Sequence, residues 1–501
     1  MSWQHGYHTD VPYTCGFYRE LAPGWLDWAA RLEGQPAPRG ADGSPFSYLE
    51  LGSGMGLGLC LLAAAYPEGQ FTGIDFQPDH IAHSQRLATA LGLTNVRFLE
   101  ADFLHLADSP GSLAGVHHYA VAHGIATWIT PPVRAALFRL AAASLRPGGL
   151  FYCSYNTVPG WLAAVPLQQL AWHEAQRRGQ GAADAAEAVR QSAAVLSRLL
   201  GPAEAPLPLG QLLPGLRGRL EGLARHDNAY LVQEYINEGW QPLSAPDLHA
   251  IAGAEKLRHL ASASLPENFL ALLPAGLREV VQEEADPTLR ALRLDLAIHQ
   301  SFRRDLFCRG RDGLTAGELA EQFSPVRFRL QEAPAQEAYN FESSFGRING
   351  RAELYSALEA SLAEGPQSFS NLQQRHSLNL GALAQALSLL LHAGRVGLDR
   401  GAAGAAAVAG CERVNTTLHR LQCLGRPYAY RAAPAIGTAV GLSLPETLLE
   451  ESLRREPEVD PLPALTRGLE RLGRRLTADP GATVQSWLGR RTWLEGLGVF
   501  T

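Results

Sequence analysis

The tightest constraint on the fold of this 501-residue chain is a run of glycines between two apolar segments. Phe46 to Leu51 ("FSYLEL") has the short apolar pattern of a buried strand, and residues 57–66 ("LGLCLLAAAY") read as a helix. Glycine stands at every second position from Gly52 to Gly58. A glycine inside a strand or helix costs about 0.5–1 kcal/mol relative to alanine. The cluster therefore predicts a turn that brings a ligand close to the backbone at a helix N-terminus, in the first βα unit of a doubly wound α/β sheet.

The residues around this turn select the ligand. A dinucleotide fingerprint, G-x-G-x-x-G, needs a third glycine where this chain has Leu57. Glu50 places a carboxylate at the end of the strand, which suits a cation and repels a pyrophosphate. The pattern E-x-G-x-G-x-G resembles motif I of class I S-adenosylmethionine methyltransferases, so we expect S-adenosylmethionine to bind and NAD not to bind. The cofactor contacts that this resemblance implies in the turn are Glu50, Gly52, Ser53, Gly54 and Gly56.

The following elements arrive in the order that this fold requires. "GQFTGIDFQP" predicts a second strand ending in Asp75, whose two oxygens can accept both ribose hydroxyls. "NVRFLEADFLHL" predicts a third strand, and in the class I enzymes an acid there bonds the adenine amino group beside an apolar neighbour. "HYAVAHGIATWI" and "LRPGGLFYCSYN" predict the fourth and fifth strands. The further cofactor contacts expected are Asp75, Phe76, Ala101, Asp102, Phe103 and His123.

Several other chemistries are disfavoured. The D/N-P-P-Y/F motif of enzymes that methylate adenine, cytosine or glutamine amino groups is missing after the fourth strand, and no cysteine follows a proline as cytosine C5 enzymes require. The six cysteines form no C-x-x-C pair, and we expect no metal site. The net charge of −6 argues against general nucleic-acid binding.

Longer stretches resemble bacterial class I methyltransferases with a methyltransferase regulatory domain, a group that includes the rickettsial outer-membrane-protein lysine methyltransferases. Residues 10–23, "AHGIATWI" and "GGLFYCSYNTVPGW" resemble the segments before the cofactor domain and after its fourth and fifth strands. "YLVQEYINEGWQPL" and "HQSFRRDLFCRG" resemble the regulatory domain. In the family the segment near Gln233 usually reads His-Glu-Tyr, whereas this chain has Gln-Glu-Tyr there. The resemblance covers residues 10–310.

The chain divides into three predicted parts. Residues 1–200 are expected to form the cofactor domain, 211–310 a mainly helical regulatory domain, and 315–501 a winged-helix-like domain. Within the last part a strand is predicted at Val396 to Leu398, and Gly401 to Gly410 reads as a small-residue linker or loop. The candidate recognition helix, Asn379 to Ala393, has no Arg or Lys, so we expect a protein-contact or structural module that does not bind DNA.

The acceptor is the least constrained part of the function. Aromatic faces hold an ammonium by cation–π attraction, worth about 0.5–2 kcal/mol each, and the residues expected to position the acceptor are Tyr13, Tyr18, Trp128, Tyr155 and Trp161. The resemblance favours a protein lysine, and a small-molecule N- or O-acceptor or a non-catalytic scaffold are the alternatives. A protein acceptor predicts an open, acidic or aromatic-lined cleft, and a small acceptor predicts a closed pocket capped by Tyr13 to Glu20. No signal peptide or membrane span is visible, so we expect a cytoplasmic protein, and the resemblance suggests a homodimer.

Overall fold

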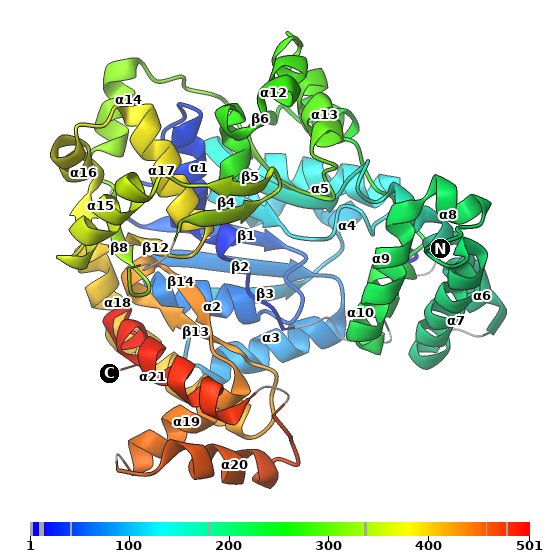
Figure 1. Ribbon diagram of the computed structural model, residues 1–501. Helices are drawn as coiled ribbons and strands as arrows, with labels where there is room; N and C mark the ends of the chain where they lie inside the picture. The colour runs from blue at the N-terminus through cyan, green and yellow to red at the C-terminus, as the bar shows by residue number, and fades with distance from the viewer. Residues whose placement is uncertain are drawn as a thin grey trace.

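A seven-stranded sheet forms the centre of the molecule. The structure is a computed structural model that describes residues 4–9, 15–40, 43–178, 181–334, 338–456, 458–476 and 479–500. The strand order is β3-β2-β1-β4-β5-β7-β6; the first five strands are parallel, and β7 runs antiparallel to both of its neighbours (Figure 1). The strands are β1 (Phe46–Leu51), β2 (Gly69–Asp75), β3 (Val96–Glu100), β4 (His117–Ala122), β5 (Leu145–Asn156), β6 (Arg258–Ser262) and β7 (Phe302–Cys308). This sheet confirms the predicted class I methyltransferase architecture.

Helices cover both faces of the sheet, as a doubly wound fold requires. One face packs against α1 (Pro23–Leu32), α2 (Leu57–Ala65) and α3 (Pro78–Ala90). The other packs against α4 (Phe103–Asp108), α5 (Pro131–Ser144) and α11 (Ala245–Ala254). The parallel strands β1, β2, β4 and β5 are buried along most of their length and are mostly apolar, whereas only Phe98 is buried in the edge strand β3.

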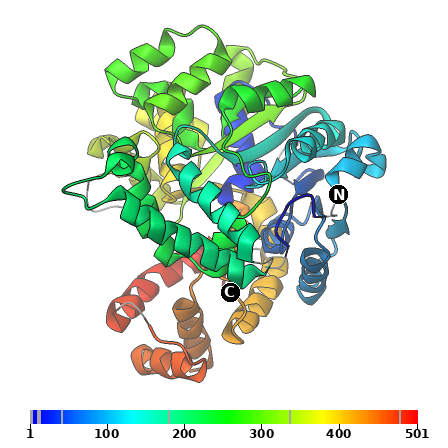
Figure 2. The same cartoon turned by 90° about the vertical axis from the view of Figure 1, so that its right-hand side faces the viewer.

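A helical segment is inserted between β5 and β6. It contains α6 (Val165–Arg178), α7 (Ala182–Leu200), α8 (Pro208–Leu212), α9 (Pro214–Gly222) and α10 (Asn228–Tyr235). These helices share an apolar core of their own and lie beyond the carboxyl ends of the parallel strands (Figures 1 and 2). The segment expected to be mainly helical also supplies β6 and β7, together with α12 (Ala275–Gln282) and α13 (Pro287–Ala297). The sheet thus contains strands that precede the boundary predicted between residues 200 and 211 and strands that follow it. The domain limits themselves remain a prediction.

The C-terminal region begins with α14 (Ala316–Phe323) and a small three-stranded sheet of β11 (Gln367–Ser368), β8 (Arg327–Leu330) and β12 (Val396–Asp399). The hairpin β9 (Asn340–Ser343)–β10 (Gly346–Asn349) and helices α15 (Ala352–Ala363), α16 (Phe369–His376) and α17 (Leu380–His392) accompany it. The predicted strand at Val396 is present, and the winged-helix assignment remains a prediction. The candidate recognition helix α17 packs inward, since Trp28 Nε1 of α1 donates to its Ser388 Oγ over 2.9 Å.

The prediction of a linker at residues 401–410 is wrong, because these residues begin the long helix α18 (Gly401–Cys423). Alanine is the strongest helix former, and small side chains let α18 pack closely on α2. The Cys411 thiol donates to the Ala64 carbonyl over 3.2 Å. Buried Arg400, just before the helix, pairs with Glu68 and stacks 4.0 Å from the Tyr66 ring centroid.

The chain ends with the hairpin β13 (Tyr430–Ala433)–β14 (Thr438–Gly441) and helices α19 (Leu444–Arg455), α20 (Pro461–Arg471) and α21 (Pro480–Gly496). These last three helices enclose a separate apolar cluster around Trp487. Within the described ranges, no helix is long and apolar enough to cross a bilayer.

Candidate active site

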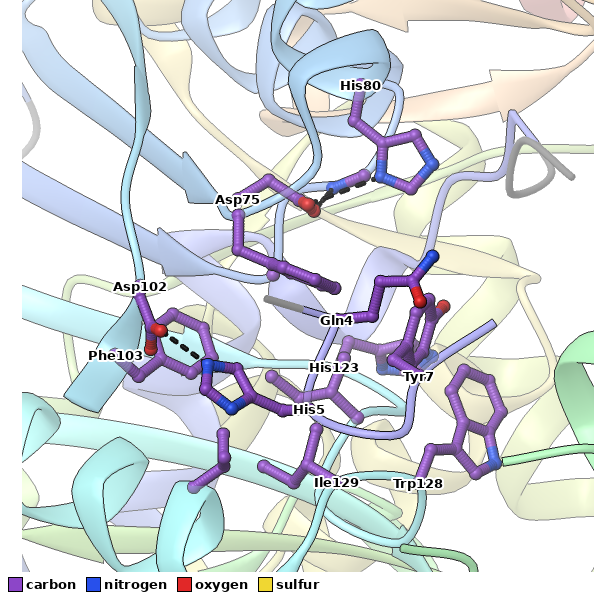
Figure 3. A pocket seen from close by; sticks show the side chains of 15 residues that line it. Gln4, His5, Tyr7, Asp75, His80, Asp102, Phe103, His123, Trp128 and Ile129 are labelled. Atoms are coloured by element: carbon purple, nitrogen blue, oxygen red, sulfur yellow. Dashed lines mark hydrogen bonds and ion pairs between the residues drawn. The ribbon is translucent and has the colours of Figure 1, made fainter. Parts of the chain in front are cut away.

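A cavity opens at the carboxyl ends of the parallel strands (Figure 3). Seven of the predicted cofactor residues line it, and so does Trp128 from the predicted acceptor set. Its lining consists of Gln4, His5, Tyr7, Gly52, Gly54, Asp75, Phe76, His80, Asp102, Phe103, His123, Ile125, Trp128, Ile129 and Val133. Eight of the fifteen lining residues are therefore among those predicted from the sequence.

The glycines of the turn fall into two kinds. Gly52 and Gly54 line the cavity with φ of +76° and +51°, conformations that favour glycine. A Cβ atom on Gly52 would lie 3.0 Å from Ile125, another lining residue. Gly56 also has a positive φ, +73°, but does not line the cavity. A Cβ atom there would lie 2.5 Å from Ser84 Oγ, so Gly56 lets α2 begin against α3.

Asp75, at the end of β2, is held rigidly at the cavity. The Gly54 N–H donates to its Oδ2 over 2.9 Å, and the Gln77 N–H donates to its Oδ1 over 3.0 Å. His80 Nδ1 lies 3.3 Å from the same Oδ1. Each carboxylate oxygen can accept more than one hydrogen bond, so a fixed Asp75 still fits a pair of ribose hydroxyls.

Asp102 occupies the corresponding position after β3. Its Oδ1 accepts from the Leu104 N–H over 2.8 Å and caps α4. Its Oδ2 lies 2.6 Å from His5 Nε2 (Figure 3). Phe103 beside it presents an apolar ring to the cavity. This pair fits the predicted contact with an adenine ring, one polar group at the edge and one apolar face.

The sequence analysis missed the part of the site that comes from the N-terminus. Residues 4–9, which we call the N-terminal strap, supply Gln4, His5 and Tyr7 to the cavity lining. Tyr7 packs edge-on against Phe76, with ring centroids 5.7 Å apart. The strap is held from α10, because Gln233 Nε2 donates to the backbone carbonyl of His8 over 3.1 Å. No local motif marks the strap, since its role depends on contacts with residues far along the chain.

Four predicted cofactor residues lie behind the cavity wall. Glu50 is partly buried, and burial together with the charge of Asp75 raises its pKa to about 8. The Ser53 hydroxyl is buried without a hydrogen-bond partner among the described residues. The Ala101 N–H donates to the Asp75 carbonyl over 3.0 Å. These residues and Gly56 are not in the lining, so their contact with the cofactor stays a prediction.

His123, at the end of β4, connects the cavity with its surroundings. Its ring lies against that of Tyr18, with centroids 3.7 Å apart, and stacks on Tyr152 from the other side at 5.9 Å. Its Nδ1 is 2.9 Å from the Tyr152 hydroxyl and 3.1 Å from Ser154 Oγ. Burial lowers the pKa of His123 to about 3, so the ring is neutral near pH 7 and does not repel a bound cation.

The predicted acceptor residues separate in the structure. Trp128 lines the cavity and Tyr18 packs on His123, so both lie beside the site. Tyr155 points to the other face of the sheet, where it is fully buried and its hydroxyl donates to Asp305 Oδ2 over 2.7 Å. The expectation that Tyr155 positions the acceptor is therefore corrected, because side chains alternate along a strand and position 155 faces away. Tyr13 lies outside the described residues.

A second, open cavity of about 640 Å³ lies between the segment that follows β5 and helices α8 to α10. Tyr230 and Tyr235 of α10 and Arg219 of α9 are among its lining residues. The Arg219 guanidinium stacks 4.0 Å from the ring centroid of Trp161, the remaining predicted acceptor residue. The cavity is thus bordered by aromatic rings of the inserted helical segment.

A buried polar cluster lies elsewhere, where β6 and β7 meet α11. Among the described residues, His249, His259 and Asp305 are the group whose ligand atoms lie close enough, within 4.8 Å, to hold a metal ion. Asp305 already pairs with Arg303 over 2.8 Å, and that positive charge opposes a bound cation. We interpret the cluster as an ion-pair network that joins the last two strands to the sheet.

The chemistry of the first cavity fits S-adenosylmethionine. Its lining contains the carboxylates Asp75 and Asp102 and no lysine or arginine among the described residues, so it suits a cationic ligand without phosphate. Phe76 and Phe103 add apolar faces for a ring. A dinucleotide would place its pyrophosphate beside two negative charges.

Comparisons with known proteins agree with this site. Residues 49–149 match the family described as "Methyltransferase domain", and residues 227–309 match "Predicted methyltransferase regulatory domain". The structure of PKMT2 from Rickettsia typhi in complex with AdoHcy superposes with a TM-score of 0.67 at 17% identity, over 96% of this chain and 99% of that one. At this identity the likeness shows a shared fold.

Two further proteins are similar to this chain in sequence. An uncharacterized protein of Synechocystis sp. is 29% identical over 90% of this chain and 88% of its own length. An uncharacterized protein of Rickettsia prowazekii is 25% identical over 61% of this chain, which spans about half, 53%, of that relative. The matched domains, the sheet and the cavity together show that this chain is a class I S-adenosylmethionine-dependent methyltransferase with a methyltransferase regulatory domain.

Proposed function

We propose that this enzyme methylates the side-chain amine of a lysine in a protein. The observation that carries the proposal is the likeness to the rickettsial PKMT2 fold over nearly the whole chain, 96%, including the inserted helices and the C-terminal region. The abbreviation PKMT agrees with the rickettsial lysine methyltransferases that the sequence resembles. The open cavity bordered by Tyr230 and Tyr235 supports it, because an extended acceptor needs access and an ammonium favours aromatic faces.

The residues of this chain would bind and orient the two reactants. When bound, S-adenosylmethionine supplies a methyl group on a sulfonium, an electrophile with a good leaving group. Asp75 and Asp102 would hold the nucleoside end of the ligand at fixed positions. His123 is neutral near pH 7 and therefore does not repel the positive charge of the ligand. The strap forms part of the wall of this cavity, where it would limit the access of water to the reactants. Positioning of this kind contributes most of the rate in an in-line displacement.

A small-molecule acceptor is the second candidate. The observation that favours it is the strap, since residues 4–9 cover the cofactor cavity as a closed pocket for a small acceptor would require. The segment from Tyr13 to Glu20 was expected to cap such a pocket, and Tyr18 of this segment packs on His123. A non-catalytic scaffold is the third alternative, and the fixed positions of Asp75 and Asp102 argue against it.

We further propose that the protein acts in the cytoplasm, that it forms a homodimer and that it does not act on nucleic acid. Sedimentation measures the dimer directly.

The deciding experiment is incubation of the enzyme with S-adenosylmethionine, tritiated on the methyl group, and a protein extract from the source organism. Acid hydrolysis and amino-acid analysis of the labelled protein should yield methylated lysine. The matched control is Asp75→Ala, which should abolish labelling at the same cofactor concentration. Label found only in acid-soluble small molecules would contradict the lysine proposal and leave the methyltransferase assignment intact.

A further inference from the structure

An amine acceptor needs a site that binds an ammonium close to the cofactor cavity, and a buried carboxylate lies where such a site is required. Glu234 of α10 is 7% exposed, and its Oε1 accepts from Asn156 Nδ2, the last residue of β5, over 2.9 Å. Asn156 is itself 5% exposed and fixed, since its backbone N–H donates to Thr127 Oγ1 over 3.1 Å. The carboxylate of an inserted helix is therefore anchored directly to the end of the central sheet.

The charge of Glu234 is not neutralised within the protein. In the described part of the chain, no Arg, Lys or His lies within ion-pair distance of its carboxylate. Arg219 of α9 acts on it from farther away while stacking on Trp161. Burying a carboxylate without a cation is costly, and buried charges in proteins are normally paired. A cationic ligand would supply the missing partner.

Aromatic side chains lead from the open cavity past Glu234 to the cofactor. Tyr230, one turn before Glu234 on α10, lines the open cavity and interacts electrostatically with both Glu234 and Tyr18. Tyr18 packs on His123, which lines the cofactor cavity. Glu234 itself lines neither cavity, but its helix neighbour Tyr230 borders the open one, and Tyr18 and His123 continue this row of rings to the cofactor cavity.

We propose, on the basis of the lysine methylation argued above, that Glu234 binds the acceptor ammonium and removes one of its protons. An N–H bond of the ammonium breaks, its proton passes to the Glu234 carboxylate, and the nitrogen keeps the electron pair. That pair forms the new bond to the methyl carbon as the carbon–sulfur bond breaks, and sulfur retains the bonding electrons. The product is a methylated ammonium, and Glu234 returns its proton to solvent when the product leaves.

The electrostatics of the site suit this role. Burial raises the pKa of Glu234 to about 7, while the Asn156 hydrogen bond and the Arg219 charge oppose the increase. The charged and titratable groups that face it are Arg219 from α9 and Tyr230 and Tyr235 on its own helix. A base is most effective when its pKa lies near the working pH. Because Glu234 ionises as pH rises through about 7, the rate of transfer should rise over the same range.

The test compares Glu234→Gln with the matched control Glu221→Gln, an exposed glutamate on α9. Glutamine keeps the oxygen that accepts from Asn156 and loses only the charge. The binding probe is N-α-acetyl-L-lysine amide, with N-α-acetyl-L-norleucine amide as its uncharged counterpart, each titrated by NMR in the presence of S-adenosylhomocysteine. We expect the wild type and the control to bind the lysine probe, and Glu234→Gln to bind it on the order of ten- to a hundredfold more weakly. Failure of the wild type to prefer the lysine probe would overturn the inference.

The second readout is the pH profile of methyl transfer to protein. We expect kcat in Glu234→Gln to fall on the order of a hundredfold and to lose its rise near pH 7, with unchanged affinity for S-adenosylhomocysteine showing that the variant is folded. Glu234→Asp should recover part of the rate. Methyl-lysine formed by Glu234→Gln at the wild-type rate and with the wild-type profile would overturn the role of Glu234 alone. A wild type that labels no protein lysine would instead overturn the proposed function, and the probe titration would still report on the ammonium site.

Discussion

Two glycines in the same turn, Gly56 and Gly58, should respond in opposite ways to replacement by alanine. Gly56 precedes α2 with φ of +73°, and a Cβ atom there would lie 2.5 Å from Ser84 Oγ and 2.9 Å from Phe98. Gly58 lies inside α2, and its added Cβ atom would find its nearest neighbour, the Gly16 carbonyl oxygen, at an ordinary 3.7 Å. Comparing the two variants distinguishes a position whose backbone conformation requires glycine, Gly56, from a helical position where alanine also fits, Gly58.

The expected magnitudes follow from these distances. For Gly56→Ala, the left-handed conformation costs about 1–2 kcal/mol and overpacking against Ser84 costs about 1–3 kcal/mol. The free energy of unfolding should therefore fall by about 2–5 kcal/mol. Gly58→Ala should raise it by about 0.5–1 kcal/mol, because alanine loses less backbone entropy than glycine in a helix.

Urea unfolding followed by circular dichroism measures both changes against the wild type. Calorimetric titration with S-adenosylhomocysteine tests the functional consequence: Gly58→Ala should bind as the wild type does, and Gly56→Ala should bind more weakly because α2 is displaced. Equal unfolding midpoints for the two variants would refute the reasoning, since they would mean that neither the positive φ nor the contact with Ser84 constrains the turn.

Three further predictions test the site and its support. Asp75→Ala should weaken binding of S-adenosylmethionine by about 1.5–3 kcal/mol, because charge-assisted hydrogen bonds to the ribose are lost; an unchanged calorimetric affinity in the folded variant would mean that Asp75 is misassigned. Glu50→Gln should stabilise the ligand-free protein above neutral pH. The raised pKa of Glu50 means that the wild type loses stability as pH rises from about 4.5 to about 8. The variant should gain up to about 4 kcal/mol over it at pH 9, and parallel stability curves from pH 5 to 9 would contradict this. Arg400→Met should lower the free energy of unfolding by about 3 kcal/mol, because it breaks a buried ion pair and leaves Glu68 without its partner. Arg375→Met, in an exposed pair with Glu364, should leave it nearly unchanged. Equal losses in urea unfolding would count against a role for Arg400 in attaching the C-terminal region to α2.

The first five strands could be predicted because each is a short apolar run followed by residues that end it. Leu51 and Asp75 end their strands at the predicted places. That Asp75 and Asp102 line the cavity follows from the rule that ligands bind beyond the carboxyl ends of the strands. The glycine turn and Asp75 lie within one βαβ unit, and Asp102 and His123 follow the next two strands along the chain. Such local patterns can be read without knowledge of the rest of the chain.

The parts that escaped prediction depend on contacts between distant segments. Pairing of β7 with β5 joins Cys308 to Leu150 across an inserted helical segment, and no pattern in either strand announces its partner. The same holds for His5 beside Asp102 and for Gln233 beside His8. The small residues from Gly401 onward looked like a linker, because alanine and glycine alone do not reveal that α2 offers a surface on which they pack.

The position of β6 and β7 explains how a helical insertion can contribute to a precise site. The segment that carries α10 leaves the sheet at the end of β5 and returns to it as β6, and β7 then pairs directly with β5. Both ends of the insertion are therefore fixed by sheet hydrogen bonds, and Asn156 fixes its middle through Glu234. A domain joined by one flexible linker would have to order itself for each turnover, at a cost in conformational entropy. Here folding of the sheet already anchors Glu234 of α10 to Asn156 at the end of β5, so the proposed amine site would form together with the cofactor cavity.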